Sequence, residues 1–137
     1  MFGLGGNDTL AGGNGVDTVD YSYRGNQPVV ASLDGLANDG AAGDLDTITS
    51  TVEILVGTDG ADTLTGNNAG NTLDGRGGND TLNPLGAGDT VFGGAGNDDI
   101  ETRDGAVDAV DCGADTDTNN ADSGDSAPGA SSPRRSS

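Results

Sequence analysis

The chain has 137 residues, of which 31% are hydrophobic and 3% aromatic, with 26 glycines and a formal net charge of −18. This composition excludes an ordinary apolar globular core, and the charge argues against nucleic acids and anionic membrane surfaces as partners, since the basic residues are five scattered arginines. Of the 23 acidic residues, 21 are Asp, and their regular spacing with Gly is not typical of a disordered acidic segment and favours divalent cations as partners.

Residues 1–20 are predicted to form two nonapeptide units, GLGGNDTLA at 3–11 and GGNGVDTVD at 12–20. Their Gly-rich turn positions tolerate positive φ, and the last three positions of each unit suit a very short strand with one inward side chain. Asp8 and Asp17, at the sixth positions, are predicted metal ligands on opposite edges of the molecule. Each is expected to need a partner from the segment that follows.

Residues 21–56 are predicted to form irregular β coils with longer strands, because the ninefold pattern fits poorly there. Alternating side chains from Val29 to Leu33 are typical of a strand, and Ile48 and residues 52–56 indicate one or two more. We expect a loop at residues 38–43. The whole chain lacks a run of eighteen apolar residues, so no membrane insertion is predicted.

Residues 57–101 contain five successive nonapeptide units without insertion or deletion. Two units make one coil of a flattened solenoid, so residues eighteen apart are predicted to stack. The sixth positions of the five units are Asp62, Asn71, Asp80, Asp89 and Asp98, and the eighth positions are Leu64, Leu73, Leu82, Val91 and Ile100. One inner column is predicted from Leu64, Leu82 and Ile100, and the other from Leu73 and Val91.

The main roll is predicted to cover residues 57–113, since Asp108 and Val110 keep the Asp-x-aliphatic signature one residue out of register. Residues 114–137 are predicted to be a disordered acidic tail, because this segment consists almost entirely of small and polar residues.

The stacked sixth positions are predicted to bind several calcium ions, because carboxylate and carbonyl oxygens are the hard ligands that calcium prefers. On one edge, sites are expected between Asp62 and Asp80 and between Asp80 and Asp98. The ligand set predicted for this edge also includes Gly60, Gly78 and Gly96, through their carbonyl oxygens, and Asn79 and Asn97. The opposite edge is predicted to be weaker, since Asn71 lacks a charge; Asp89 is its expected ligand, with Asp108 as a candidate partner.

Metal-dependent folding is predicted from the small apolar core and from the mutual repulsion of the Asp side chains. Metal binding then supplies folding free energy, so we expect a largely disordered metal-free chain and a folded calcium-loaded one. The expected affinity is that of extracellular calcium modules, with a Kd of about 10⁻⁴–10⁻³ M.

The repeat pattern G-G-x-G-x-D-x-aliphatic-x is matched by residues 12–20 and by residues 93–101, the latter with a less typical residue after the Asp. In these motifs the chain resembles the RTX (repeats-in-toxin, hemolysin-type) calcium-binding family. The resemblance implies an all-β, right-handed parallel β-roll, or β-solenoid, with calcium between successive turns. It also implies secretion from a bacterium to an extracellular location, with type I secretion machinery or a cell surface as further partners.

Two sequence features bear on export and closure of the roll. No N-terminal signal peptide is visible, so the chain is expected either to be a fragment or to carry an export signal of another kind. The stretch 103–113 resembles family C-termini in which a later Cys would pair with Cys112, but the sequence has no second Cys.

A non-catalytic role is predicted, because the sequence has no His for a His-based triad or an HExxH zinc site, and no G-x-S-x-G elbow. The alternatives are a structural spacer in an adhesin or surface layer, and the C-terminal fragment of a secreted RTX enzyme or toxin. An ice-binding solenoid is not favoured, because no Thr ladder occupies the turns. The oligomeric state and the biological role of the parent protein stay open.

Overall fold

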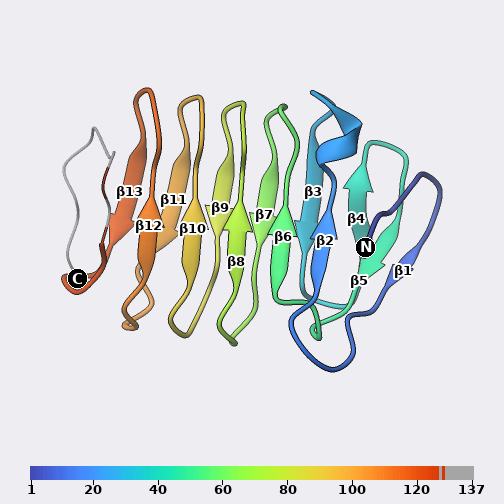
Figure 1. The fold of residues 1–137 in the computed structure, drawn as a ribbon, viewed down its shortest axis with the longest axis horizontal. Helices are drawn as coiled ribbons and strands as arrows, with labels where there is room; N and C mark the ends of the chain where they lie inside the picture. The colour runs from blue at the N-terminus through green and yellow to red at the C-terminus, as the bar shows by residue number, and fades with distance from the viewer. Residues whose placement is uncertain (127, 129–137) are drawn as a thin grey trace.

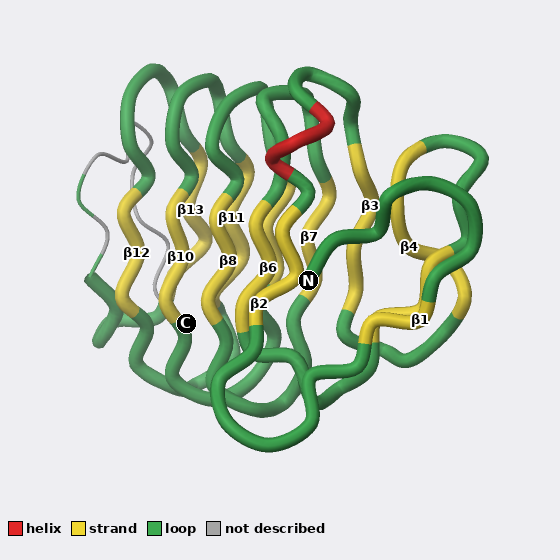
Figure 2. Tube along the Cα trace, turned by 45° about the vertical axis from the view of Figure 1, so that its right-hand side comes forward, coloured by secondary structure: helices red, strands yellow, loops and turns green. Residues whose placement is uncertain are grey.

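The computed structural model describes residues 1–126 and 128, which fold as a roll of short strands stacked along one axis (Figure 1). Within these residues, one sheet has the strand order β1-β5-β4-β3-β7-β9-β11-β13 and the other has the order β12-β10-β8-β6-β2. Consecutive strands of the repeat array alternate between the two sheets, and turns connect them at both edges of the roll (Figure 2). The predicted class, an all-β parallel roll, is confirmed.

The repeat array forms the regular part of the roll. Its strands in the first sheet are β7 (Thr63–Thr65), β9 (Thr81–Asn83) and β11 (Asp99–Thr102), and those in the second are β6 (Ile54–Val56), β8 (Thr72–Asp74), β10 (Thr90–Phe92) and β12 (Ala109–Asp111). Leu82 is in parallel register with both Leu64 and Ile100, and Val91 with both Leu73 and Val110. All of these aliphatic side chains are buried, so the two predicted inner columns are confirmed.

The N-terminal part is less regular. It contains β1 (Thr9–Leu10), β2 (Thr18–Asp20), the 3-10 turn η1 (Ser22–Arg24), β3 (Val29–Ser32), β4 (Ala37–Ala41) and β5 (Asp46–Ile48). β1 pairs in parallel with β5, β2 with β6, and β3 with β7.

The loop expected at residues 38–43 is wrong for residues 38–41, because β4 occupies Ala37–Ala41 and runs antiparallel to both β3 and β5; residues 42–43 form a turn. Buried Asp39 explains the strand: its carboxylate accepts hydrogen bonds from the backbone N–H of Ser32 (2.6 Å) and of Ile48 (3.0 Å). The Asn-Asp-Gly sequence is typical of a turn, but these contacts across three strands override it.

The disordered tail expected from residue 114 is wrong for the first part of that segment. Residues Thr118–Ala121 form β13, which pairs in parallel with β11, and Ser126 forms a bridge with Ala109. Asn119 takes the inward place opposite Ile100 and is itself buried. Residues 127 and 129–137, where the rest of the predicted tail falls, lie outside the described residues. In the described part, no helix is long and apolar enough to cross a membrane.

Candidate metal centres at the two edges

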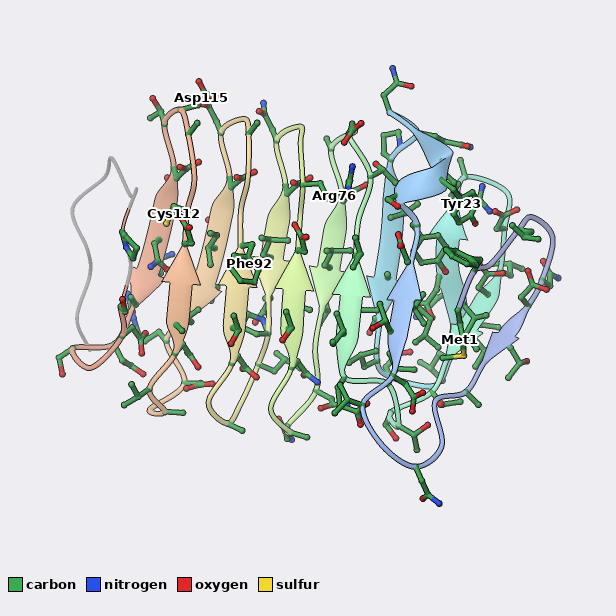
Figure 3. The ribbon with its side chains drawn as sticks, viewed as in Figure 1. Met1, Tyr23, Arg76, Phe92, Cys112 and Asp115 are labelled. Atoms are coloured by element: carbon green, nitrogen blue, oxygen red, sulfur yellow. The ribbon has the colours of Figure 1, made fainter. Side chains whose placement is uncertain are left out.

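The turns before β7, β9, β11 and β13 form the first edge of the roll, at the top of Figure 3, where Arg76 and Asp115 are labelled. A ladder of buried carboxylates runs along this edge. Asp80 Oδ1 accepts a hydrogen bond from the backbone N–H of Asp62 (2.8 Å), and Asp98 Oδ1 accepts one from that of Asp80 (2.9 Å). Asp117, which sequence reasoning missed, extends the ladder by accepting from the N–H of Asp98 (2.9 Å). The stacking predicted from the eighteen-residue spacing is therefore present.

The turns before β8, β10 and β12 form the second edge, which carries an equivalent ladder. Asp89 Oδ1 accepts from the backbone N–H of Asn71 (2.7 Å), and Asp108 Oδ1 accepts from that of Asp89 (2.7 Å). Asp125 continues this ladder by accepting from the N–H of Asp108 (2.9 Å). The register slip after residue 101 is thus absorbed without breaking the stack.

Several Asp residues of the two ladders, and Asp17 near the N-terminus, have a second carboxylate oxygen that accepts no hydrogen bond from the described residues. Among residues 1–126 and 128, the following buried Oδ2 atoms have no hydrogen-bond partner: those of Asp17, Asp80, Asp89, Asp98 and Asp108. An anionic oxygen that is removed from water and left without a partner is costly. These atoms are therefore suited to bind a cation.

The pKa values of these carboxyls reflect the same conflict. Burial, followed by the charges of Asp62 and Asp98, raises the pKa of Asp80 to about 8. Burial also raises the pKa of Asp89 to about 7, and those of Asp98 and Asp108 to about 6. In the fold without a cation, these carboxyls therefore keep their protons to a higher pH than an exposed Asp does.

The first residue of a repeat unit lies directly against its carboxylate. A Cβ on Gly75 would overlap Asp80 Oδ2 and would lie 2.8 Å from the carbonyl oxygen of Gly93. A carboxylate oxygen and a carbonyl oxygen from successive coils thus converge over a residue that must be Gly. Calcium prefers such oxygen pairs.

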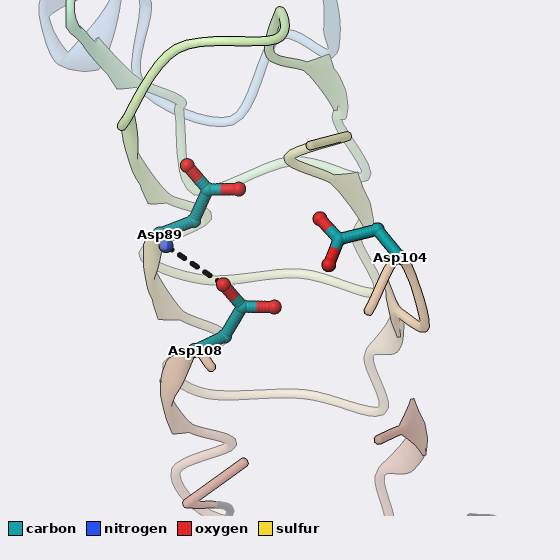
Figure 4. Close-up of side chains that lie close together, drawn as sticks. All are labelled: Asp89, Asp104 and Asp108. Carbon is teal, nitrogen blue, oxygen red and sulfur yellow. Dashed lines mark hydrogen bonds between the residues drawn. The ribbon is translucent and has the colours of Figure 1, made fainter. Parts of the chain in front are cut away.

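The second edge also holds a three-carboxylate cluster, drawn in Figure 4. Carboxylate oxygens of Asp89, Asp104 and Asp108 lie within 4.8 Å of one another, and this is the one such acidic group in the part of the chain that the structure describes. Asp89 and Asp108 are buried, whereas Asp104 is exposed. This edge was predicted to be the weaker one, and Asp104 was not among the predicted ligands, although it is an acidic residue four positions before Asp108.

Residues 21–56 place an acidic side chain beside each of the two N-terminal Asp residues. The backbone N–H of Asp8 donates to Asp46 Oδ1 (2.9 Å), and that of Asp17 donates to Glu53 Oε2 (2.8 Å). Asp8 precedes a strand of the first sheet and Asp17 one of the second, which places them on opposite edges. The triplet Asp46-Thr47-Ile48 repeats the Asp-Thr-aliphatic signature, but out of register with the count of nines.

The other residues predicted for the first edge lie in its turns. The carbonyl oxygens of Gly60 and Gly78 lie so close to the next turn that a Cβ on Gly78 or Gly96, respectively, would overlap them. Asn79 Oδ1 accepts from the backbone N–H of Asn97 (2.8 Å), and Asn97 Oδ1 accepts from that of Thr116 (3.0 Å). The amide oxygens of these exposed Asn residues are thus engaged in stacking the turns.

A family model described as the RTX calcium-binding nonapeptide repeat matches residues 1–22, 47–82 and 86–106, in four copies. These ranges make up more than half of the chain and include Asp62, Asp80 and Asp98 of the first ladder and Asn71 and Asp89 of the second. The chain belongs to the RTX calcium-binding nonapeptide repeat family. A comparison with curated proteins finds no match. Membership of the RTX repeat family implies that this roll binds calcium, which agrees with the buried oxygens that lack partners.

Proposed function

We propose that this RTX chain is a non-catalytic module that folds when calcium binds its two carboxylate ladders. The observation that carries the proposal is the row of buried Oδ2 atoms without hydrogen-bond partners among the described residues. Each lies in a turn whose next neighbour on the same edge contributes another carboxylate, so a cation there offsets repulsion along the whole ladder.

The ligands that we propose fall into three groups. On the first edge they are Asp80 and Asp98, with backbone carbonyl oxygens of the stacked turns. On the second edge they are Asp89, Asp104 and Asp108, whose carboxylates already converge. Near the N-terminus it is Asp17, beside Glu53. This all-oxygen set favours calcium over magnesium, because magnesium requires near-ideal octahedral geometry and keeps several of its waters.

The setting that we propose is extracellular, where millimolar calcium would saturate sites with a Kd of about 10⁻⁴–10⁻³ M. In a compartment with little free calcium, the uncompensated ladders would keep the chain unfolded and ready for export. Secretion machinery or a cell surface as partners, and the division at residues 20, 56 and 113, remain predictions from the sequence.

Isothermal calorimetry with calcium titrated into the full chain tests this function, and magnesium serves as the matched control. We expect heat that saturates at millimolar calcium with more than one ion bound, and at most weak heat with magnesium. A chain that takes up no calcium at these concentrations would overturn the proposal.

A further inference from the structure

Asp62 differs from Asp80 and Asp98 of the same edge in having both carboxylate oxygens hydrogen-bonded within the described residues. Its Oδ1 accepts from the backbone N–H of Val29 (2.9 Å), and its Oδ2 accepts from the backbone N–H of Thr58 (2.6 Å). The Thr58 hydroxyl lies 2.9 Å from Oδ1 and 3.2 Å from Oδ2 and donates its hydrogen to this carboxylate. The same hydroxyl oxygen accepts from the N–H of Gly60 (2.9 Å), so the buried turn is closed by its own donors.

The next turn of this edge has the opposite arrangement. Asp80 Oδ1 accepts from Asp62, but its Oδ2 has no hydrogen-bond partner within the described residues. The equivalent of Thr58 is Arg76, whose φ of 72° turns its N–H away to the carboxylate of Asp74 (3.1 Å). In the turn after that, Gly94 also has a positive φ of 101°.

The residue type at this second position accounts for the difference. Positive φ is a rare and strained conformation for a β-branched residue, and Thr58 is not among the described residues that adopt it. With φ negative, both donors of Thr58 point into the turn and reach Asp62. Donors that surround a carboxylate occupy the lone pairs that a cation needs, and displacing them would leave a buried N–H and a buried hydroxyl without partners.

We propose that Thr58 takes the place of calcium at Asp62, so that the residue at the second position of a repeat decides whether its turn binds metal. The inference rests on the proposed function and corrects the prediction that Asp62 is a ligand. The neighbouring turn on the other edge agrees with it: the N–H of Asn67 donates to Asn71 Oδ1 (2.8 Å), and Asn71 carries no charge. Residues 57–74 thus form one coil that needs no calcium.

Equilibrium dialysis of the full chain against calcium alone gives the number of ions bound and tests the inference directly. D62N is expected to bind as many ions as the wild type, whereas D80N is expected to lose at least one. If D62N lost as many ions as D80N, Asp62 would be a ligand and the inference would be overturned. If the wild type bound none, the proposed function itself would fail, which is a distinct result.

A gain of binding is the sharper test. Thr58→Gly removes the hydroxyl and permits positive φ, so we expect one additional calcium ion per chain. Thr58→Ser keeps the hydroxyl, and Arg76→Gly changes the same position of a turn that is already open, so both are expected to leave the count unchanged. A count for a folded T58G equal to that of the wild type would contradict the inference, and if T58G does not fold, the pair D62N and D80N decides.

Discussion

The carboxylate of Asp80 has one hydrogen-bonded oxygen and one buried oxygen without a partner among the described residues. Asp62 has the same burial and the same place in the ladder, but Thr58 supplies it with donors. The backbone N–H and hydroxyl of one residue, Thr58, therefore account for the difference between the two carboxylates. We therefore expect each turn of the nonapeptide array to bind calcium, or not to bind it, according to the residues around its own carboxylate.

The pH dependence of the metal-free chain follows from the pKa values of the ladder carboxyls. An Asp in an unfolded chain has a pKa of about 3.9, whereas in the fold burial raises that of Asp80 to about 8 and that of Asp89 to about 7. The folded chain therefore binds more protons, and the stability that it gains below the unfolded pKa is lost as pH rises through these values.

We accordingly expect the chain in chelator to have more β structure at pH 5 than at pH 9, as measured by circular dichroism. Calcium competes with protons for the same oxygens, so its affinity should rise over this interval. A metal-free chain whose β content increases with pH would show that the ladder carboxyls are not the groups that limit folding.

Asp104→Asn tests the three-carboxylate cluster of the second edge. Two unit charges about 4 Å apart near a protein surface interact by about 4 kcal/mol, and the exposure of Asp104 reduces this. We expect calcium to bind the cluster about 10-fold more weakly, equivalent to about 1.4 kcal/mol. Calorimetry measures the change, and Asp99→Asn, an exposed strand position outside the cluster, is the control. Equal losses of calcium affinity in the two variants would mean that Asp104 acts only through the net charge of the chain and not as a ligand.

Among the repeat elements, the turn is where packing is most restrictive. Gly75→Ala would place a Cβ against Asp80 Oδ2 and 2.8 Å from the carbonyl oxygen of Gly93. We expect it to lower the free energy of unfolding in millimolar calcium by about 1–3 kcal/mol, as measured by urea denaturation. Gly86→Ala is the matched control: its nearest contact is 3.4 Å, to Asn68 Oδ1, so a change within about 0.5 kcal/mol is expected. If Gly75→Ala were as stable as the control, Asp80 and the Gly93 carbonyl could move away from the added methyl group without loss of stability.

The strands and ladders of the repeats could be predicted from the sequence because a period of nine specifies both the inward aliphatic and the stacked Asp. Strand β4 could not, since Asp39 and Gly40 are typical of a turn and become a strand only through hydrogen bonds to distant residues. Strand β13 was missed because buried Asn119 replaces the aliphatic residue of the signature. The role of Thr58 could not be predicted, because it depends on the φ angle at the second position of the repeat, which the nine-residue period does not specify.

Across the whole molecule, the carboxylate oxygens without hydrogen-bond partners lie on both sides of the coil at residues 57–74, whose own turns are satisfied by internal hydrogen bonds. Asp17 lies on the N-terminal side of this coil, and Asp80, Asp89, Asp98 and Asp108 lie on the C-terminal side. Buried aliphatic columns run through all of these coils without interruption. Calcium would therefore complete the two ends of the roll around a coil that is stabilised by its own hydrogen bonds.

Far-ultraviolet circular dichroism of the full chain, in chelator at pH 8 and again in millimolar calcium, tests whether calcium binding to the ladders drives folding. We expect a largely unstructured spectrum in chelator and a β spectrum that appears with calcium and disappears when calcium is removed. The same β content under both conditions would contradict this expectation.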